Sequence, residues 1–222
     1  MATDARKLVE RVIDQIEHLP TLPQVVGNLL TMTESPSVDA MKLSKALDQS
    51  LAAKILKVAN SAYYGKRKVH SISQGIVIIG FNEVKEIILT ASLFHTFRDA
   101  RDIQALQPLW QHSLECAVIA KRLAWICRYE AMDEAYFAGL IHDIGKLVIQ
   151  QYFPEVYEQI HKIKGEGVES LEAEKEILGL THAEIGGKMA QHWQFPATLV
   201  DAIIHHHDQD WKLNPRLGKI LH

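Results

Sequence analysis

A histidine and an aspartate stand side by side in the apolar run GLIHDIGK, residues 139–146. An imidazole nitrogen and a carboxylate oxygen both bind divalent transition metals such as zinc, iron, manganese or nickel. Because a His-Asp pair is common by chance, it indicates a metal site only if neighbouring segments supply further ligands. Further histidines in segments that are predicted to be helical include His112, His182 and the triplet His205–His207. The sequence therefore contains a spaced set of ligands around His142 and Asp143.

The cost of burial favours a metal at this set. Several imidazoles and a carboxylate that converge between packed helices are costly to bury unless a cation or hydrogen bonds satisfy them. A bound metal lowers the pKa of a coordinated water towards about 7, and the hydroxide can attack phosphorus. Lys146 would hold the phosphate or offset the developing negative charge, although it also fits a solvated lysine near a helix end. Asp143 and Lys146 are therefore the candidate catalytic residues.

The segments that position these residues are predicted to be helical, because nearly all have the helical period and almost none alternates. One helix is expected over residues 109–129, with His112, and another over residues 133–152, with the His-Asp pair. Thr181 and Glu184 form a capping box that opens the helix carrying His182. Pro196 starts a helix that reaches His206, and a last helix opens at residues 214–215.

The N-terminal half also has the helical period. Ser50 and Ser71 are predicted N-caps, and Asn82 is expected to cap a long helix that ends near residue 97. The β-branched run at residues 76–79 is assigned to a short buried helix, since Gly80 follows it and no partner strand is apparent. The period breaks at residues 98–102. We therefore expect an all-α, two-part helical bundle with subdomains at residues 1–100 and 101–222.

Composition indicates a cytoplasmic protein with a substantial core. The chain is 47% hydrophobic with a net charge of -3, so its overall charge does not indicate nucleic-acid binding. No apolar run approaches the roughly 18 residues of a membrane span, and no signal peptide opens the sequence. Cys116 and Cys127, about 16 Å apart on one helix, cannot form a disulfide with each other and are expected to be reduced core residues.

Acidic residues also stand near the histidines in the sequence, and they are interpreted in different ways. Glu115, one turn from His112, could orient a ligand histidine from behind. Glu174 belongs to a group predicted to form a solvated helix face, together with Glu169, Glu172 and Glu176.

A nucleic-acid site is the less favoured alternative. Residues 42–70 contain seven lysine or arginine residues against one aspartate. Residues 43–59 also resemble a helix-turn-helix, although such look-alikes arise in many helical bundles.

Short motifs in the N-terminal half carry a resemblance to a known family. They are LPTLP at residues 19–23, LKVANSA at residues 56–62, and Ser71-Ile72 followed by Ile79-Gly80. With the His-Asp pair, they resemble the HDOD family, the "HD-related output domain" of bacterial signalling proteins, over about residues 8–222. HDOD proteins are related to the helical, metal-dependent HD phosphohydrolases.

The resemblance implies a role for each candidate position. His112 matches the first HD histidine, and His142 and Asp143 match the defining pair. His182 resembles the middle histidine, His206 and His207 match the later paired histidines, and Lys146 matches the lysine of the HDxGK pattern. The expected ligands of a divalent metal (Fe, Mn, Zn or Ni) are therefore His112, His142, Asp143, His182, His206 and His207.

Two departures from the HD pattern limit the expected activity. The segment HDQDWKLNP at residues 207–215 lacks the Gly-Tyr-Pro loop of HD-GYP enzymes, which argues against cyclic-di-GMP hydrolysis. A closing aspartate is absent, and the final helix is expected to be cut short at residue 222. We therefore expect a regulatory module that relays a signal through a partner protein, an attached domain or a ligand. The alternative is a metal-dependent phosphohydrolase acting on a nucleotide or phosphoester.

Overall fold

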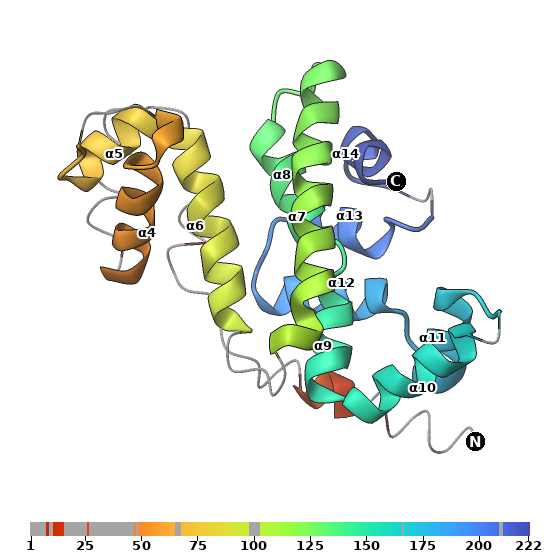
Figure 1. Ribbon diagram of the computed structural model, residues 1–222. Helices are drawn as coiled ribbons and strands as arrows, with labels where there is room; N and C mark the ends of the chain where they lie inside the picture. The colour runs from red at the N-terminus through yellow and green to blue at the C-terminus, as the bar shows by residue number, and fades with distance from the viewer. Residues whose placement is uncertain are drawn as a thin grey trace. The chain divides into compact units, whose positions relative to one another are not determined.

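The computed structural model describes Leu8, Val26, Leu47 and residues 11–15, 49–64, 68–97, 103–165, 167–208 and 211–222. Over these residues the chain is all-α, as predicted (Figure 1). The chain divides into two compact units. One unit is Leu22–Arg98, and the other joins Met1–Thr21 to Asp99–His222.

The unit Leu22–Arg98 contains helices α4 (Gln49–Ala59), α5 (Ile72–Ile79) and α6 (Phe81–Thr96), with a short 3-10 helix, η1 (Ala62–Tyr64). Helix α5 packs on both α4 and α6. The expected helix-turn-helix begins at residues that lie outside the described ones. Helix α4 begins at Gln49, so Ser50 lies within it and the prediction that Ser50 is the N-cap is wrong.

Helix α5 confirms that the β-branched run is helical. Ser71 Oγ accepts a hydrogen bond from the Gln74 amide at 3.2 Å, as predicted for an N-cap. Only one face is buried, because 80% of Val77 is exposed. Gly80 then links α5 directly to α6 with φ of 102°, a conformation that favours glycine. Gly80 is the N-cap of α6 and Asn82 lies within the helix, so the predicted Asn82 cap is wrong.

The second unit contains the helices that carry the candidate site. They are α7 (Ile103–Ile126), α8 (Met132–Ile141), α9 (Ile144–Tyr152), α10 (Pro154–Gly165), α11 (Ser170–Leu178), α12 (His182–His192), α13 (Ala197–Ile204) and α14 (Pro215–Leu221). Helix α7 packs along α8, and α12 packs against both α9 and α13 (Figure 1). Among the described residues, no helix is both long and apolar enough to cross a membrane.

The His-Asp pair interrupts a segment that the period predicts as one helix. Helix α8 ends at Ile141 and α9 begins at Ile144, with Asp143 at φ of -97° and ψ of 14°. Residues 135–141 are all buried. A helix that is apolar on every side has no stripe whose end would mark this break. The predicted helix over residues 133–152 is therefore two helices joined at the pair.

The cysteines of α7 and the turn after it are free, as expected. Cys116 is only half-buried and Cys127 is exposed, so the expectation that both are core residues is wrong. Helix α7 presents several apolar side chains to solvent near its C-terminal end, and its apolar content therefore did not indicate which side was buried.

Candidate metal centre

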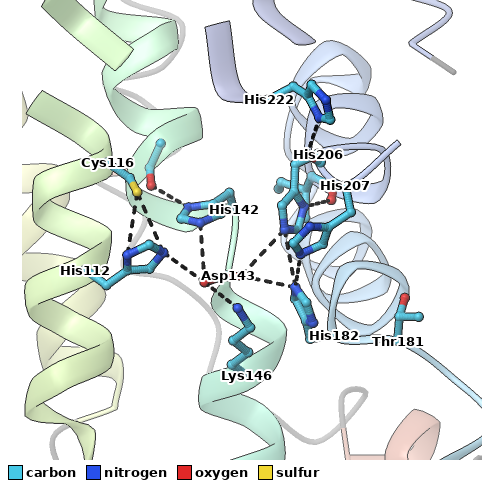
Figure 2. Close-up of polar contacts among 12 residues, drawn as sticks. His112, Cys116, His142, Asp143, Lys146, Thr181, His182, His206, His207 and His222 are labelled. Carbon is cyan, nitrogen blue, oxygen red and sulfur yellow. Dashed lines mark hydrogen bonds and ion pairs between the residues drawn. The ribbon is translucent and has the colours of Figure 1, made fainter. Parts of the chain in front are cut away.

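One carboxylate, that of Asp143, lies between the predicted ligand residues (Figure 2). Its Oδ2 atom is 2.7 Å from Lys146 Nζ, 3.2 Å from His112 Nε2 and 3.3 Å from His142 Nε2. We call His112, His142 and Lys146 the outer side of the cluster, because half of the His112 side chain is exposed. A single oxygen atom thus meets side chains from α7, the α8–α9 junction and α9.

The other oxygen, Asp143 Oδ1, faces His182 and His206, which we call the inner side. Their Nε2 atoms lie 3.1 and 3.5 Å from Oδ1. His207, at the edge of this side, brings its Nε2 to 2.9 Å from that of His182. Oδ1 is buried, yet it makes no hydrogen bond of acceptable geometry with the described residues. A buried carboxylate oxygen in this state lacks the hydrogen-bond donor or cation that would offset the cost of its burial.

Two imidazoles are anchored by backbone carbonyls. His142 Nδ1 donates to Gly139 O at 2.8 Å, and His206 Nδ1 donates to Ile203 O at 2.6 Å. Because a carbonyl only accepts, each Nδ1 carries a proton, and Nε2 is the atom left to act as a metal ligand. Both Nε2 atoms face Asp143. This is the tautomer and orientation that a metal-ligating histidine needs.

A third imidazole is anchored by Glu174. His182 Nδ1 donates to Glu174 Oε2 at 2.8 Å, and the His182 amide donates to the same oxygen at 2.7 Å. Only 3% of Glu174 is exposed, so its assignment to a solvated face is wrong. Glu115 instead accepts from Gln111 at 2.9 Å in an exposed position. The signal that was missed is the place of Glu174 four residues before the buried Leu178, on the apolar stripe of α11.

The separations on the inner side match the edges of a coordination sphere. Bonds of about 2.0–2.1 Å at tetrahedral angles place neighbouring N and O ligands about 3.3–3.4 Å apart. The observed separations are 3.3 Å from His182 Nε2 to His206 Nε2, and 3.1 and 3.5 Å from these atoms to Asp143 Oδ1. The donor set of Asp143, His182, His206 and His207 therefore fits a divalent metal ion.

The environment keeps Asp143 ionised. Burial alone would raise the pKa of this carboxyl, but the imidazoles of His142, His182 and His206 outweigh burial and hold the pKa well below its usual range. Asp143 is therefore an anionic ligand across the neutral pH range.

The inner histidines differ in protonation. Burial lowers the pKa of His206, and burial with the nearby His206 and His182 lowers the pKa of His207 to about 4. Burial also acts against a charged His182, but Asp143 and Glu174 outweigh it and raise the pKa of His182. The raised pKa favours the charged form of His182, whereas the lowered pKa values of His206 and His207 favour neutral nitrogens that can bind a metal.

Two glycines set the spacing of the helices that meet at Asp143. A Cβ atom at Gly145 would lie 2.0 Å from His182 O, so the backbones of α9 and α12 are in direct contact. A Cβ atom at Gly139 would lie 2.8 Å from Cys116 O, so the backbones of α8 and α7 also lie close together. Side chains at these positions would separate the helices that carry the ligands.

The structure brings every predicted site residue to one place. They are His112, His142, Asp143, Lys146, His182, His206 and His207. His205 is directed elsewhere, since its Nδ1 pairs with Asp208 at 3.0 Å. The capping box that starts α12 is present as predicted, with Thr181 Oγ1 accepting from the Glu184 amide at 3.2 Å.

Residues 19–209 match the HDOD domain family. The chain belongs to the HDOD family. An HDOD domain protein from Geobacter sulfurreducens has the same fold, with a TM-score of 0.83 and 26% identity over 99% of this chain and 76% of that chain.

Two further proteins are similar to this chain. A candidate phosphohydrolase from Shewanella amazonensis SB2B has a TM-score of 0.76 and 27% identity, over 95% of this chain and 77% of that chain. An uncharacterized protein of Treponema pallidum (strain Nichols) is 25% identical over 211 residues, which are 93% of this chain and 41% of that protein. The chain thus spans about two fifths of the length of this relative.

Proposed function

We propose that this HDOD chain is a regulatory module that relays a signal to a partner protein, an attached domain or a ligand, and that a divalent transition metal stabilises its signalling conformation. The supporting observation is the convergence of anchored imidazoles on the buried Asp143 Oδ1, which lacks a hydrogen bond of acceptable geometry among the described residues. When bound, the metal supplies a positive charge and a Lewis acid at this point.

The residues of the chain have distinct roles in this proposal. Asp143, His182, His206 and His207 would hold the ion, and Glu174 fixes the ring orientation of His182. Lys146 offsets the charge on Asp143 Oδ2 at 2.7 Å. The ligands come from the α8–α9 junction, the start of α12 and the end of α13. An ion here would therefore tie three separate segments together.

Such a link gives the metal control over stability. A ligand that binds only the folded state adds about 2.7 kcal/mol at a concentration 100 times its Kd. This free energy is enough to shift the balance between a closed and a looser arrangement of α12 and α13 by roughly 100-fold, provided that only the closed arrangement binds the metal.

Elemental analysis and thermal unfolding test the metal. Protein purified without chelator is expected to contain a transition metal, and a chelator is expected to lower its Tm. His206→Ala should abolish both the metal and the chelator effect. His205→Ala is the matched control, because the ring of His205 pairs with Asp208 outside the cluster. Metal-free protein whose Tm ignores added zinc, iron, manganese and nickel would refute the proposal.

Phosphoester hydrolysis is the second candidate function. The outer side supports it, because 50% of the His112 side chain and 26% of the Lys146 side chain are exposed next to Asp143. A phosphoester could therefore reach this side. A panel of nucleotides and phosphoesters should show turnover that Asp143→Asn and Lys146→Ala both abolish. Turnover that survives either substitution would exclude this site as its source.

A further inference from the structure

A cavity of about 150 Å³ lies between α9, α10 and α11, and we call it the α10–α11 pocket. Among its lining residues, Ile149, Ile160 and Glu174 are buried, whereas His161 and Lys164 are exposed and mark its opening to solvent. One water molecule needs about 10–15 Å³ of such a cavity. The pocket therefore has room for roughly ten water molecules or for a small organic ligand.

Helix α10 turns one face towards this pocket. Tyr157, Ile160, His161 and Lys164 all line it, and residues with these spacings lie on one side of a helix. The ring of Tyr157 packs on that of His161, with 4.4 Å between the ring centroids. Aromatic packing thus holds the imidazole at the opening of the pocket.

The pocket has a positive charge that its own residues leave unpaired. Lys164 forms no ion pair with the described residues. Partial burial and the nearby charge of Lys164 lower the pKa of His161. Glu174 is the one acidic residue among the described lining residues, and His182 Nδ1 already lies 2.9 and 2.8 Å from its two oxygens. The charge at Lys164 therefore favours an anionic ligand.

The hydrogen-bond donors of the pocket suit a phosphate better than a carboxylate. They are the side chains of Lys146, His161, Lys164 and Ser170. Lys146 uses one of its three N–H groups for Asp143, at 2.7 Å, and two remain for a ligand. A phosphate monoester offers three terminal oxygens as acceptors, whereas a carboxylate offers two. Lysine side chains are common phosphate ligands in proteins.

The same pocket has an apolar wall, formed by Leu109, Ile149 and Ile160. We propose that the α10–α11 pocket binds a small organic phosphate, with the phosphate at Lys164 and His161 and the organic group against this wall. The proposal rests on the proposed function, because this phosphate would be the ligand whose signal the module relays. None of the residues that line the pocket is a metal ligand of the cluster.

Two lining residues connect the pocket to the metal cluster. Lys146 pairs with Asp143 Oδ2, and Glu174 orients His182. A phosphate that draws Lys146 away from Asp143 removes a positive charge that opposes metal binding at this carboxylate. Bound phosphate should therefore tighten metal binding, and by linkage the metal should tighten phosphate binding by the same factor.

Calorimetric titration of the full chain with phenylphosphonate tests the pocket, both as purified and after treatment with a chelator. The C–P bond of this probe resists hydrolysis, so binding is measured without turnover. Phenylphosphonate should bind more tightly than benzoate, which carries a carboxylate on the same ring. Lys164→Ala should weaken phenylphosphonate binding by about tenfold or more, a typical loss for a hydrogen bond between charged groups. Lys162→Ala, exposed on α10 but outside the pocket, is the matched control and should bind as the wild type does.

NMR of the histidine rings locates the bound probe. Phenylphosphonate should shift the ring resonances of His161, which are identified by their loss in His161→Gln. The ring of His205, which pairs with Asp208 away from the pocket, should not shift. Shifts confined to His112 and His142 would place the anion at the metal cluster and would overturn the pocket assignment.

The remaining outcomes separate the pocket from the metal. A Kd above about 10 mM, equal or tighter binding of benzoate, or unchanged binding in Lys164→Ala would overturn the pocket assignment. Because the chelator-treated chain contains no metal, these results would leave the metal of the proposed function untouched. Zinc-loaded chain should bind phenylphosphonate more tightly than the chelator-treated chain, and Lys164→Ala should reduce the affinity in both. Equal affinity with and without zinc would overturn the role of this phosphate as the ligand that the module relays.

Discussion

The inner and outer sides of Asp143 differ in burial and in how their residues are held. The side chains of His182 and His206 are only 1% and 3% exposed, and each ring is fixed by a hydrogen bond from Nδ1. On the outer side, His142 is likewise buried and anchored, but His112 is half exposed and Lys146 is one quarter exposed. The inner side is thus the more enclosed of the two, whereas His112 and Lys146 open the outer side to solvent.

This difference bears on how each side would bind an ion or a ligand in the proposed function. Preorganised ligands lose little conformational entropy when an ion binds, so the inner side favours high affinity. Exposed side chains must be ordered on binding and their charges are screened by water. Ions, anions or phosphoesters should therefore enter and leave from the outer side. Substitutions at Asp143 should affect both sides, whereas substitutions at other residues of the cluster should affect mainly one side.

Replacement of Asp143 should have the largest effect. Asp143→Asn keeps the size of the side chain but removes the charge that both sides share. We expect metal affinity to fall by more than about 1,000-fold, the equivalent of roughly 4 kcal/mol. Calorimetric titration with zinc measures this loss. Asp208→Asn, outside the cluster, should bind zinc as the wild type does. If Asp143→Asn binds zinc with an affinity within tenfold of that of the wild type, Asp143 is not the ligand that the two sides share.

Replacement of Gly145 should separate the inner helices. In Gly145→Ala the new methyl group would overlap His182 O, which is backbone and cannot rotate away. We expect unfolding to become easier by about 3 kcal/mol, a typical cost of overpacking at its upper end. Urea unfolding measures the change. Gly165→Ala is the control, because no atom lies within 4 Å of its added Cβ. Equal stability of the two variants would show that α9 and α12 can move apart freely.

Replacement of Glu174 should weaken the inner side without removing a ligand. Glu174→Gln weakens the acceptor that orients His182, and loss of such an outer partner costs about 10- to 100-fold in metal affinity. Zinc titration should show this loss, whereas Glu176→Gln, exposed on the same helix, should change nothing. An unchanged affinity in Glu174→Gln would mean that the orientation of His182 does not depend on this carboxylate.

The sequence predicts the fold class and the members of the cluster, because both follow from local patterns. Helical periodicity identifies α12 and α13, and the spacing of His112, His182 and His206 identifies separate segments that carry ligands. The role of Glu174 is not predicted, because an isolated helix does not show which neighbour covers its acidic residue. Only the packing of α11 near the start of α12 places Glu174 behind His182.

The break at the His-Asp pair also depends on tertiary structure. Helix α8 is buried on all sides, so its hydrophobic pattern continues smoothly into α9. The close contacts at Gly139 and Gly145 decide where each helix lies, and glycines inside helices are ambiguous in sequence alone. Position-specific backbone contacts therefore account for the part of the site that periodicity does not predict.

Replacement of His112 should have the smallest effect on the inner ion. The half-exposed His112 contacts Asp143 at 3.2 Å, and a contact this exposed contributes less than about 1 kcal/mol, or roughly a fivefold change in affinity. His112→Ala should thus keep a tightly bound inner metal, which elemental analysis of the purified variant measures. His182→Ala, which removes an inner ligand, should do the reverse and weaken the inner ion strongly. If His112→Ala instead releases all metal, the two sides form one site, and the distinction between an enclosed inner side and an open outer side does not hold.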